Sequence, residues 1–418
     1  MCSGFPKGSS SIKELKRDDD SIGIHRASAS GFLTRMLNRC PSGVVAVETK
    51  ASTPAGAAAE LASVLPASGL AAVLMFVSPR YDPHRFAAEM TTRFRGTPVF
   101  GCTTAGEIAF NGWDENSVVA LAFSAADFDV AALPILGLSD FRIEDDRTIG
   151  ADIRHRVFRQ GGNADGERCF GLLLIDGMCQ REEVVLAAIH ASLGHIPLVG
   201  GSAADGLRFE RSWVYFEGRA HTDAAVLLVF KTSVPFLIFS CDTCEPGTEK
   251  MVVTEADPDR RTISELNAEP AAAEYSRMAG IAGGVLDVTA FASHPVLVRI
   301  GDAYYARWVR RVDADGTLHF ASAIDQGLVF TMATLRDPVD PTSDLFAQIQ
   351  EEIGEVSLYI GFESVQRRMG LEHRCDRDMS ELYRTHRVFG CNTYGELYGP
   401  MHINGTLTGV AIGTPRAK

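Results

Sequence analysis

The sequence lacks any apolar run long enough to span a bilayer as a helix, which takes about 20 residues. Its longer apolar runs, such as Leu70–Val77, have the length of a β-strand. Residues 1–20 are polar and rich in serine and lysine, so they also lack the apolar segment of a secretion signal. We therefore expect a cytoplasmic protein that does not insert into a membrane.

An excess of positive charge is also missing, since the net charge is −13 and the isoelectric point is about 5.4. A protein that binds nucleic acid regardless of sequence needs a positive surface that releases the counterions of the phosphates. Docking onto anionic lipid needs a similar basic surface. The charge balance therefore argues against nucleic-acid and membrane partners.

The nine cysteines show no spacing typical of a disulfide framework. Cys241-x-x-Cys244 has the spacing of two metal ligands, but no second pair of ligands follows nearby. The glycine pairs at 200–201 and 283–284 are not followed by the lysine of a P-loop or by the spacing of a dinucleotide-binding turn. These absences favour reduced thiols, and they argue against a zinc site and the common nucleotide-binding motifs.

A short signature recurs along the chain. Val99–Ile108 reads VFGCTTAGEI, and Val388–Leu397 reads VFGCNTYGEL. A looser copy, Leu198–Leu207, reads LVGGSAADGL. Two or three copies of one signature in a chain of 418 residues indicate an internally repeated fold.

The same order of elements surrounds each copy. A continuous apolar run of strand length comes first, as expected of a strand covered on both faces. A helix follows, and in the first copy Asp82 and Pro83 supply its cap and its first residue. The signature then turns at its glycine, and another strand closes the unit. First strands are expected at Leu70–Val77, Cys169–Ile175 and Val356–Phe362, and closing strands at Ser117–Phe123, Ala224–Phe230 and Leu407–Ile412.

This order predicts mixed β-sheets with packed helices, of α/β to α+β type, because a strand–helix–strand crossover pairs its strands in parallel. Ser264–Met278 is expected to be a helix interrupted by Pro270, and antiparallel strands are expected between Pro295 and Ile324. We expect a mobile tail at 1–38, a domain at 39–234 with two copies of the signature, and a domain at 235–418 with the third.

Glycines at the ends of strands permit positive φ and let a ligand approach the backbone, whose successive N–H groups can bind an anion. The alternative is that they only let the strand turn tightly over a helix. Glu107 and Glu396 follow their glycines at the same offset, where the second copy has Leu207. Each carboxylate either anchors the mouth of a pocket or accepts N–H groups of its own loop. The candidate ligand-binding residues are Gly101, Cys102, Gly106, Glu107, Gly200, Gly201, Ser202, Gly390, Cys391, Tyr394 and Glu396.

Cys102 and Cys391 hold equivalent positions in the signature, and we place Ser202 opposite them in the second copy. A thiol at such a turn could act as a nucleophile, but only with a nearby base and a depressed pKa. No histidine follows at a recognisable spacing, so a small buried residue is the better interpretation. We therefore assign no catalytic residue and expect the protein not to be an enzyme.

The signatures resemble those of the FIST family, a ligand-sensing module of signalling proteins with paired FIST N and FIST C domains. Phe100–Ile108, Leu198–Asp205 and Thr222–Val226 carry the N-terminal resemblance, and Asn392–Glu396 and Met401–Gly413 carry the C-terminal one. The two-domain layout is similar to that of the haem-binding, nitric-oxide-sensing members. The resemblance implies a sensor that binds haem, reads nitric oxide at the iron and relays the result to a separate signalling enzyme such as a histidine kinase.

An imidazole can bind haem iron, and an aromatic ring can pack on a porphyrin face. Counted back from the strand that follows the signature, one loop position carries Trp113, His221 and His402 in the three copies. His84 and Tyr398 complete the candidate cofactor-binding set, in which His402, His221 and His84 are alternative ligands of one haem iron. Histidines in such places are also commonly structural, hydrogen-bonded residues.

Two other functions stay open. A haem-free module for amino acids or similar metabolites would bind its ligand through the N–H groups of the glycine turns. A cysteine-dependent enzyme would use Cys102 or Cys391 as nucleophile. No kinase, cyclase or receiver pattern occurs in this sequence, so the signalling output is expected in a partner protein.

Overall fold

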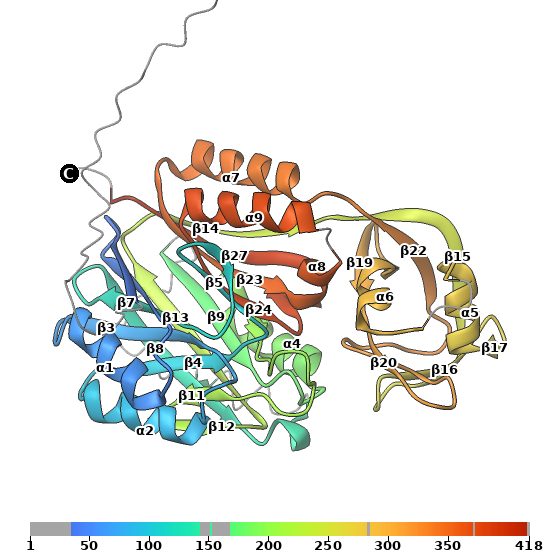
Figure 1. Cartoon of the computed structure of the whole chain (residues 1–418), viewed down its shortest axis with the longest axis horizontal. Helices are drawn as coiled ribbons and strands as arrows, with labels where there is room; N and C mark the ends of the chain where they lie inside the picture. The colour runs from blue at the N-terminus through green and yellow to red at the C-terminus, as the bar shows by residue number, and fades with distance from the viewer. Residues whose placement is uncertain (1–34, 143–150, 153–167, 282–284, 371–372, 416–418) are drawn as a thin grey trace, which may run out of the picture.

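The computed structural model of the chain describes residues 35–142, 151–152, 168–281, 285–370 and 373–415 (Figure 1). Within them, mixed β-sheets carry packed helices, which confirms the predicted fold class. No helix in these ranges combines the length and the apolar character that a membrane span requires. Most of the tail expected at 1–38 lies outside the described residues, and strand β1 (Arg35–Arg39) already begins at Arg35.

Three units of the same topology form the larger part of the molecule. In each unit four strands pair side by side. Named by their order along the chain, they lie in the sheet as first, fourth (the last), second and third. The last strand is antiparallel to both of its neighbours, and the second and third strands are parallel. Unit one is β2 (Val44–Thr49), β7 (Val118–Ser124), β3 (Leu70–Val77) and β4 (Val99–Thr103); unit two is β8 (Phe128–Leu136), β13 (Ala224–Thr232), β9 (Cys169–Ile175) and β10 (Leu198–Ser202); unit three is β14 (Phe236–Asp242), β27 (Thr406–Gly413), β23 (Val356–Ser364) and β24 (Val388–Thr393).

Each unit also gives a short hairpin to the sheet of another unit, and we call these the swapped hairpins. The hairpin of unit one, β5 (Glu107–Ala109) and β6 (Gly112–Asp114), pairs with β24 of unit three. That of unit two, β11 (Val214–Phe216) and β12 (Arg219–His221), pairs with β4 of unit one. That of unit three, β25 (Glu396–Tyr398) and β26 (Met401–Ile403), pairs with β10 of unit two. Every sheet is therefore completed by a different unit.

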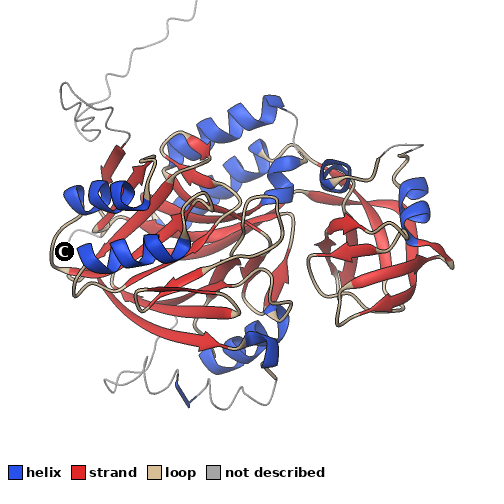
Figure 2. Ribbon diagram, turned by 60° about the horizontal axis from the view of Figure 1, so that its bottom comes forward, coloured by secondary structure: helices blue, strands red, loops and turns tan. Residues whose placement is uncertain are grey.

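The helices lie on the outer faces of the three sheets, and the inner faces meet in a common core (Figure 2). Phe76 of β3 and Phe362 of β23 meet there edge to face, with ring centroids 5.7 Å apart. Asp82 caps its helix as predicted, because its carboxylate accepts the Arg85 N–H at 2.8 Å. The outer helices are α1 (Pro54–Val64) and α2 (Pro83–Arg93) on unit one, α4 (Glu182–Leu193) on unit two, and α7 (Val339–Ile353) and α9 (His373–His386) on unit three, with the short segments η1 (Leu138–Asp140) and α8 (Val365–Met369) beside them.

Between β14 and α7 the chain forms a second body, which we call the inserted β-domain and define as residues Cys244–Leu335 (Figure 1). It has its own hydrophobic core, which includes Met251, Tyr275 and Phe330. Its elements are β15 (Cys244–Asp257), β16 (Thr262–Leu266), β17 (Glu269–Pro270), α5 (Ala271–Met278), α6 (Val288–Ser293), β18 (Val296–Ile300), β19 (Ala303–Arg307), β20 (Val309–Val312), β21 (Leu318–Phe320) and β22 (Val329–Leu335). The antiparallel strands expected between Pro295 and Ile324 are present.

The helix expected at Ser264–Met278 is wrong in its first half. Ser264 lies in β16, and only Ala271–Met278 is helical. Asn267 and Ala268 have φ of 53° and 62°, which turns the chain back so that β17 pairs with β16. Pro270 lacks a backbone N–H and cannot continue a helix from before it, so the helix starts just after this residue.

The signature glycines Gly101, Gly200 and Gly390 are required by the close approach of parallel strands. A Cβ atom at these positions would lie 2.2 Å from Met75 O, 1.9 Å from Leu173 O and 1.8 Å from Gly361 O, respectively. A backbone carbonyl cannot move without shifting its whole strand. These glycines therefore serve strand packing.

Gly390→Ala is expected to lower the free energy of unfolding. Overpacking a core typically costs roughly 1–3 kcal/mol, and a clash with a backbone carbonyl should cost at least that much. Gly361→Ala on the paired strand is the matched control, because its Cβ would meet only side-chain atoms, Val388 Cγ1 at 3.2 Å and Leu407 Cδ1 at 3.3 Å. Urea unfolding of both variants measures the difference. Equal losses for the two variants would contradict the packing role of Gly390.

Candidate functional site

The strand register corrects the alignment of the second signature copy by one residue. Gly101, Gly200 and Gly390 each pair with the same position of the neighbouring parallel strand. The next residue is Cys102 in unit one, Cys391 in unit three and Gly201 in unit two. Ser202, which the sequence analysis placed opposite the cysteines, is one position further along. A slip of one residue in a strand moves a side chain to the opposite face.

The alignment of Trp113, His221 and His402 with one another also needs a correction of one residue in the second unit. In the swapped hairpins, Trp113 pairs with Ile108 and His402 pairs with Leu397, which are equivalent. The equivalent pair in unit two is Tyr215 with Ala220, so His221 is displaced by one residue. The position is also part of a strand in each unit, where a loop was expected. Only Trp113 and His402 therefore share a structural position.

Cys102 and Cys391 lie together in the central core, each with no exposed surface. Burial raises the pKa of the Cys391 thiol well above its ordinary value, and the hydrogen bond with Cys102 raises it further. A protonated, inaccessible thiol is a poor nucleophile. The geometry thus agrees with the interpretation of these cysteines as small core residues.

Glu107 is fully buried at the start of β5, where its carboxylate accepts three hydrogen bonds. Thr104 Oγ1 donates to Oε1 at 2.5 Å, and Ser117 donates to Oε2 from both N and Oγ at 3.0 Å. Glu396 has the same arrangement in unit three, with Thr393 and Thr406 as donors. Each carboxylate accepts a backbone N–H from its own loop, as one of the two interpretations expected.

Burial nevertheless has the largest effect on the pKa of both carboxyl groups. It raises the pKa of Glu107 to about 7 and that of Glu396 to about 8, against the lowering effect of the hydrogen bonds. In unit two the equivalent position is Val214, and Leu207 lies in a longer connection between β10 and β11. There the buried carboxylate is Asp176, which accepts the Ser212 hydroxyl and the Asp223 N–H.

A cavity of about 600 Å³ opens where the three units meet the inserted β-domain. Its wall combines apolar side chains with a small number of charged groups, as is common in ligand sites. Unit one contributes Ser78, Pro79, Ala105, Gly106, Glu107, Glu115 and Asn116; unit two contributes Gly206 and Leu207; unit three contributes Val365, Arg368, Met369 and Asp376; and the inserted β-domain contributes Thr289.

Arg368 is the cation of this cavity. Its Nη1 donates to Asn392 Oδ1 at 3.1 Å, its Nη2 lies 3.4 Å from Glu115 Oε1, and its guanidinium lies over the Trp113 ring at 5.5 Å. Gly106 faces it with φ of 142°, and a Cβ there would lie 2.7 Å from Nη1. The glycine is therefore needed both for its backbone conformation and for the close approach of Arg368.

Two of the predicted ligand-binding residues, Gly106 and Glu107, line this cavity. A third, Tyr394, supports the wall from behind, because its hydroxyl contacts the Asp205 carboxylate and donates to Gly206 O at 3.1 Å. The other eight predicted residues are buried within the described structure but do not line the cavity: Gly101, Cys102, Gly200, Gly201, Ser202, Gly390, Cys391 and Glu396.

Among the predicted haem ligands, His84 and His221 lie together between α2 and β12, away from the cavity lining. The His84 ring meets Trp213 edge to face at 4.8 Å, and the His221 ring stacks on Phe216 at 4.0 Å. Burial lowers the pKa of His221, and the neighbouring charges of Arg219 and His84 lower it further. Both imidazoles are thus packed against aromatic side chains.

His402 and Trp113 are fixed by protein contacts as well. Nδ1 of His402 donates to Glu183 Oε1 at 3.0 Å, and a Cβ on Gly395 would lie 2.0 Å from Nε2. Trp113 Nε1 donates to Glu363, and Tyr398 packs at the edge of the central core. Neither nitrogen of His402 is open to an iron atom, and no candidate imidazole lines the cavity, so these residues do not fit a haem there in this conformation.

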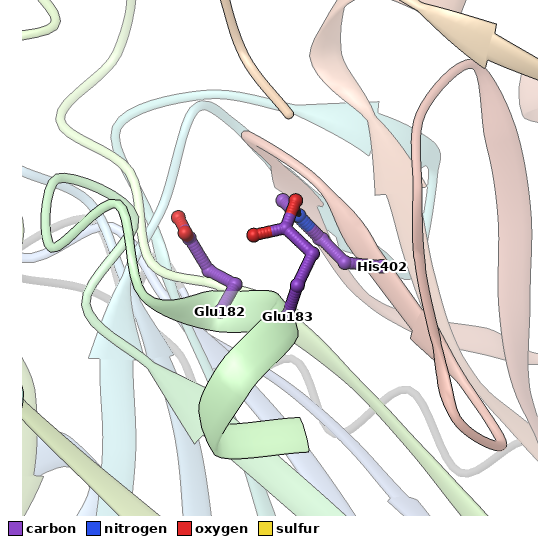
Figure 3. Close-up of side chains that lie close together, drawn as sticks. All are labelled: Glu182, Glu183 and His402. Atoms are coloured by element: carbon purple, nitrogen blue, oxygen red, sulfur yellow. Dashed lines mark hydrogen bonds and ion pairs between the residues drawn. The ribbon is translucent and has the colours of Figure 1, made fainter. Parts of the chain in front are cut away.

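Glu182, Glu183 and His402 form a buried cluster whose ligand atoms lie within 4.8 Å of one another (Figure 3). Such a set resembles a metal site, but Arg261 of the inserted β-domain already binds both carboxylates, at 2.7 Å from Glu182 Oε2 and in direct contact with Glu183. Its guanidinium supplies the positive charge that a metal would bring. The cluster is therefore an ion-pair network.

The sequence analysis missed the charged residues of the cavity, namely Arg368, Glu115 and Asp376. Arg367 and Arg368 are adjacent in the chain but differ in surroundings. Arg367 is buried and pairs with Glu363 at 2.5 Å, whereas Arg368 lines the cavity. The signal that could separate them is the spacing of four residues between Glu363 and Arg367, which is typical of a helical ion pair.

Glu396→Gln is expected to flatten the pH dependence of stability between about pH 4.5 and 8. Because the folded-state pKa of Glu396 is raised to about 8 from 4.5, the folded state binds more protons than the unfolded state in this range. Stability therefore falls as the pH rises, by up to roughly 1.4 kcal/mol per pH unit for this group. Chemical denaturation from pH 4.5 to 8.5 measures the slope.

Glu351→Gln on the exposed face of α7 is the matched control, and it should leave the slope unchanged. A Glu396→Gln protein with the slope of the parent protein would contradict the raised pKa.

Comparison with known proteins gives two family matches for this chain and several similar solved structures. Residues 71–269 match the FIST N domain and residues 271–399 match the FIST C domain. Comparison with curated proteins gives no match. Among solved structures, a cyanuric acid hydrolase from A. caulinodans is similar, with a TM-score of 0.36 and 10% identity over 89% of this chain and 99% of that chain.

The boundary between the two family matches falls at Pro270, at the start of α5 inside the inserted β-domain. Together the matches cover more than three quarters of the chain. The chain therefore belongs to the FIST family, with a FIST N domain followed by a FIST C domain.

Proposed function

We propose that this FIST protein is a sensor that binds a small polar metabolite of the amino-acid type in the cavity between its units. FIST domains are sensory ligand-binding modules, which sets the class of function. The observation that carries the proposal is Arg368, a guanidinium at the wall of a cavity of about 600 Å³ that Glu107, Glu115 and Asp376 also line. Cavities of this size suit metabolites and small drug-like ligands.

Arg368 suits the carboxylate end of such a ligand. A guanidinium presents five N–H donors in a planar fork that matches a carboxylate. The contacts with Asn392 and Glu115 orient it, and the missing side chain at Gly106 lets it lie close to the backbone at the cavity wall. A carboxylate that replaced the 3.4 Å contact with Glu115 would gain a shorter charge-assisted bond.

The carboxylates of Glu115 and Asp376 suit the ammonium end of the ligand. Glu115 is largely exposed at the rim, with 66% of its side chain accessible, so it can turn toward a bound cation. Glu107 also lines the cavity, but both of its carboxylate oxygens are already bonded to Thr104 and Ser117. Val365, Met369 and Pro79 leave apolar surface for the side chain of the metabolite.

Haem binding and nitric-oxide sensing are the other proposal, and they rest on the resemblance to the haem-binding members of the family. Optical spectra after reconstitution with haem test it directly, with His84→Ala, His221→Ala and His402→Ala proteins beside the parent. A Soret band that one substitution shifts or abolishes would support haem binding. The absence of such a band would rule out haem binding and leave metabolite binding as the remaining proposal.

The signalling output is assigned to a separate enzyme such as a histidine kinase. This assignment rests on the sequence, which shows no catalytic pattern of its own. Ligand binding must then change a surface that the partner contacts, since a ligand shifts an equilibrium only through unequal affinity for two states.

Arg368→Gln is expected to abolish the thermal stabilisation that a bound amino acid confers. A ligand at 100 times its dissociation constant stabilises a protein by roughly 2.7 kcal/mol, which is readily seen as a rise in melting temperature. A thermal-shift screen against the twenty common amino acids, with the parent and the variant side by side, measures the loss. Arg384→Gln on the exposed face of α9 is the control and should keep the parent's response. An equal shift in the Arg368→Gln protein would contradict the role of Arg368.

A further inference from the structure

The inserted β-domain is joined to the three units by a two-stranded stalk. The stalk is formed where the start of β15 pairs with the end of β22, from Cys244 opposite Leu335 to Pro246 opposite Ala333. The pairing then breaks and resumes at Lys250, so β15 carries an irregular segment at this point. The residues from Glu245 to Lys250 are exposed. An exposed ribbon with a break in its strand pairing bends more easily than a regular one, because few packing contacts oppose the motion.

This domain also supplies one wall of the cavity. Thr289 of α6 lines it together with Ser78 and Gly106 of unit one. The helix carrying Thr289 packs against α8, and the contact is close: a Cβ on Gly370 would lie 2.7 Å from Ala292 O. Because α8 carries Arg368, movement of the inserted β-domain away from the units would open the cavity beside this residue.

A buried ion-pair network holds the domain in place. Arg261 Nη2 binds Glu182 and Glu183 at the start of α4, and its Nη1 donates to Ala321 O at 2.6 Å. Glu183 Oε1 accepts the Ala323 N–H of the inserted β-domain at 2.8 Å and Nδ1 of His402. Figure 3 shows Glu182, Glu183 and His402 side by side. The network thus joins the inserted β-domain to units two and three.

The titration of Glu183 agrees with this geometry. Burial alone would raise the pKa of Glu183, but His402 and Arg261 outweigh it and hold the pKa well below its ordinary value. The carboxylate therefore stays charged in the docked state, where Arg261 and His402 are its nearest partners.

Two further arginines oppose docking. Arg307 and Arg310 of the inserted β-domain are 8% and 7% exposed, and their hydrogen bonds go to backbone carbonyls such as Ala323 O and Phe320 O. Among the described residues, neither has a carboxylate partner within ion-pair distance. Burial lowers the pKa of both guanidinium groups, which is the mark of an unfavourable environment for their charge. Glu183 near Arg307 and Glu182 near Arg310 act against this lowering, but burial outweighs them. Exposure to water in an open arrangement would remove this burial cost.

We propose that the inserted β-domain is a lid on the cavity, bending at the β15–β22 stalk and held closed by the ion pairs of Arg261 with Glu182 and Glu183. Closing pairs Arg261 with two carboxylates, and opening hydrates Arg307 and Arg310. The two opposing contributions leave a balance that contacts across the cavity can shift. The lid position is then the structural change that a signalling partner reads.

The lid can be tested without any ligand. Arg261→Met keeps an unbranched apolar side chain but leaves the buried Glu182 and the half-buried Glu183 without their guanidinium. Breaking a buried pair in this way is expected to raise the opening equilibrium about a hundredfold. Hydrogen exchange should then show a matching loss of protection in α6 and α8, while the strands of unit one stay protected. Small-angle X-ray scattering should show a larger radius of gyration for the variant.

Arg277→Met is the matched control, because Arg277 pairs with Glu274 inside the inserted β-domain at 2.7 Å and not with the units. It should leave both measurements at the parent's values. Glu183→Gln is the second variant, which weakens the same network with little change of shape and reports the same opening if Arg261→Met does not fold. Unchanged exchange in α6 and α8 for folded Arg261→Met or Glu183→Gln protein would overturn the lid.

The lid takes the cavity as the ligand site, so it rests in part on the proposed function, but its readout is separate. Loss of ligand response in Arg368→Gln with normal lid exchange reports on the cavity alone. Opening of the lid in Arg261→Met with no amino acid bound by the parent would keep the lid and reject the metabolite.

Discussion

The cyclic exchange of the swapped hairpins is the constraint on which the rest of the structure depends. Each sheet of four strands is completed by two strands from another unit, so the three units close on one another around a common core. The loops that lead into these hairpins must then run between units. Ala105 binds the backbone of Asn392, and Ser202 binds that of Gly395. This is why the glycine signatures, far apart in the chain, meet in one region.

The loops that cross between units bury carboxylates, and the fold compensates each of them locally. Glu107 and Glu396 are satisfied by hydroxyl and backbone donors of their own loops, without a cation. Glu363 is satisfied by Arg367, Tyr383 and Trp113. Burial raises the pKa of Glu107 and Glu396, whose donors are neutral, whereas Glu363 is paired with the guanidinium of Arg367. The two kinds of acid therefore have different tasks, even though both lie at the ends of strands.

The cavity and the Arg261 network are two outcomes of inserting a domain into a closed arrangement of units. The inserted β-domain leaves and returns through adjacent strands, so its contacts with units two and three form only by folding back over the loops. Where these contacts are tight, Arg261 meets Glu182 and Glu183. Where they are open, Arg368 and Thr289 both line the cavity. The cavity wall and the position of the inserted β-domain are thus linked through α8 and α6.

The sequence alone was enough for local features whose cause is local. Leu70–Val77 and Cys169–Ile175 are strands as their continuous apolar runs predicted, and Asp82 caps its helix. The repeated signature predicted the repeated unit and the family. The sequence did not determine register. Ala225 rather than Val226 is equivalent to Val118, so counting back from Val226 misplaced His221 by one residue, and Ser202 is equivalent to Thr103 rather than Cys102. Only the tertiary structure decided which loops meet, since hairpin exchange, the charge on the cavity wall at Arg368 and the pairing of Arg261 all join residues that no local pattern connects.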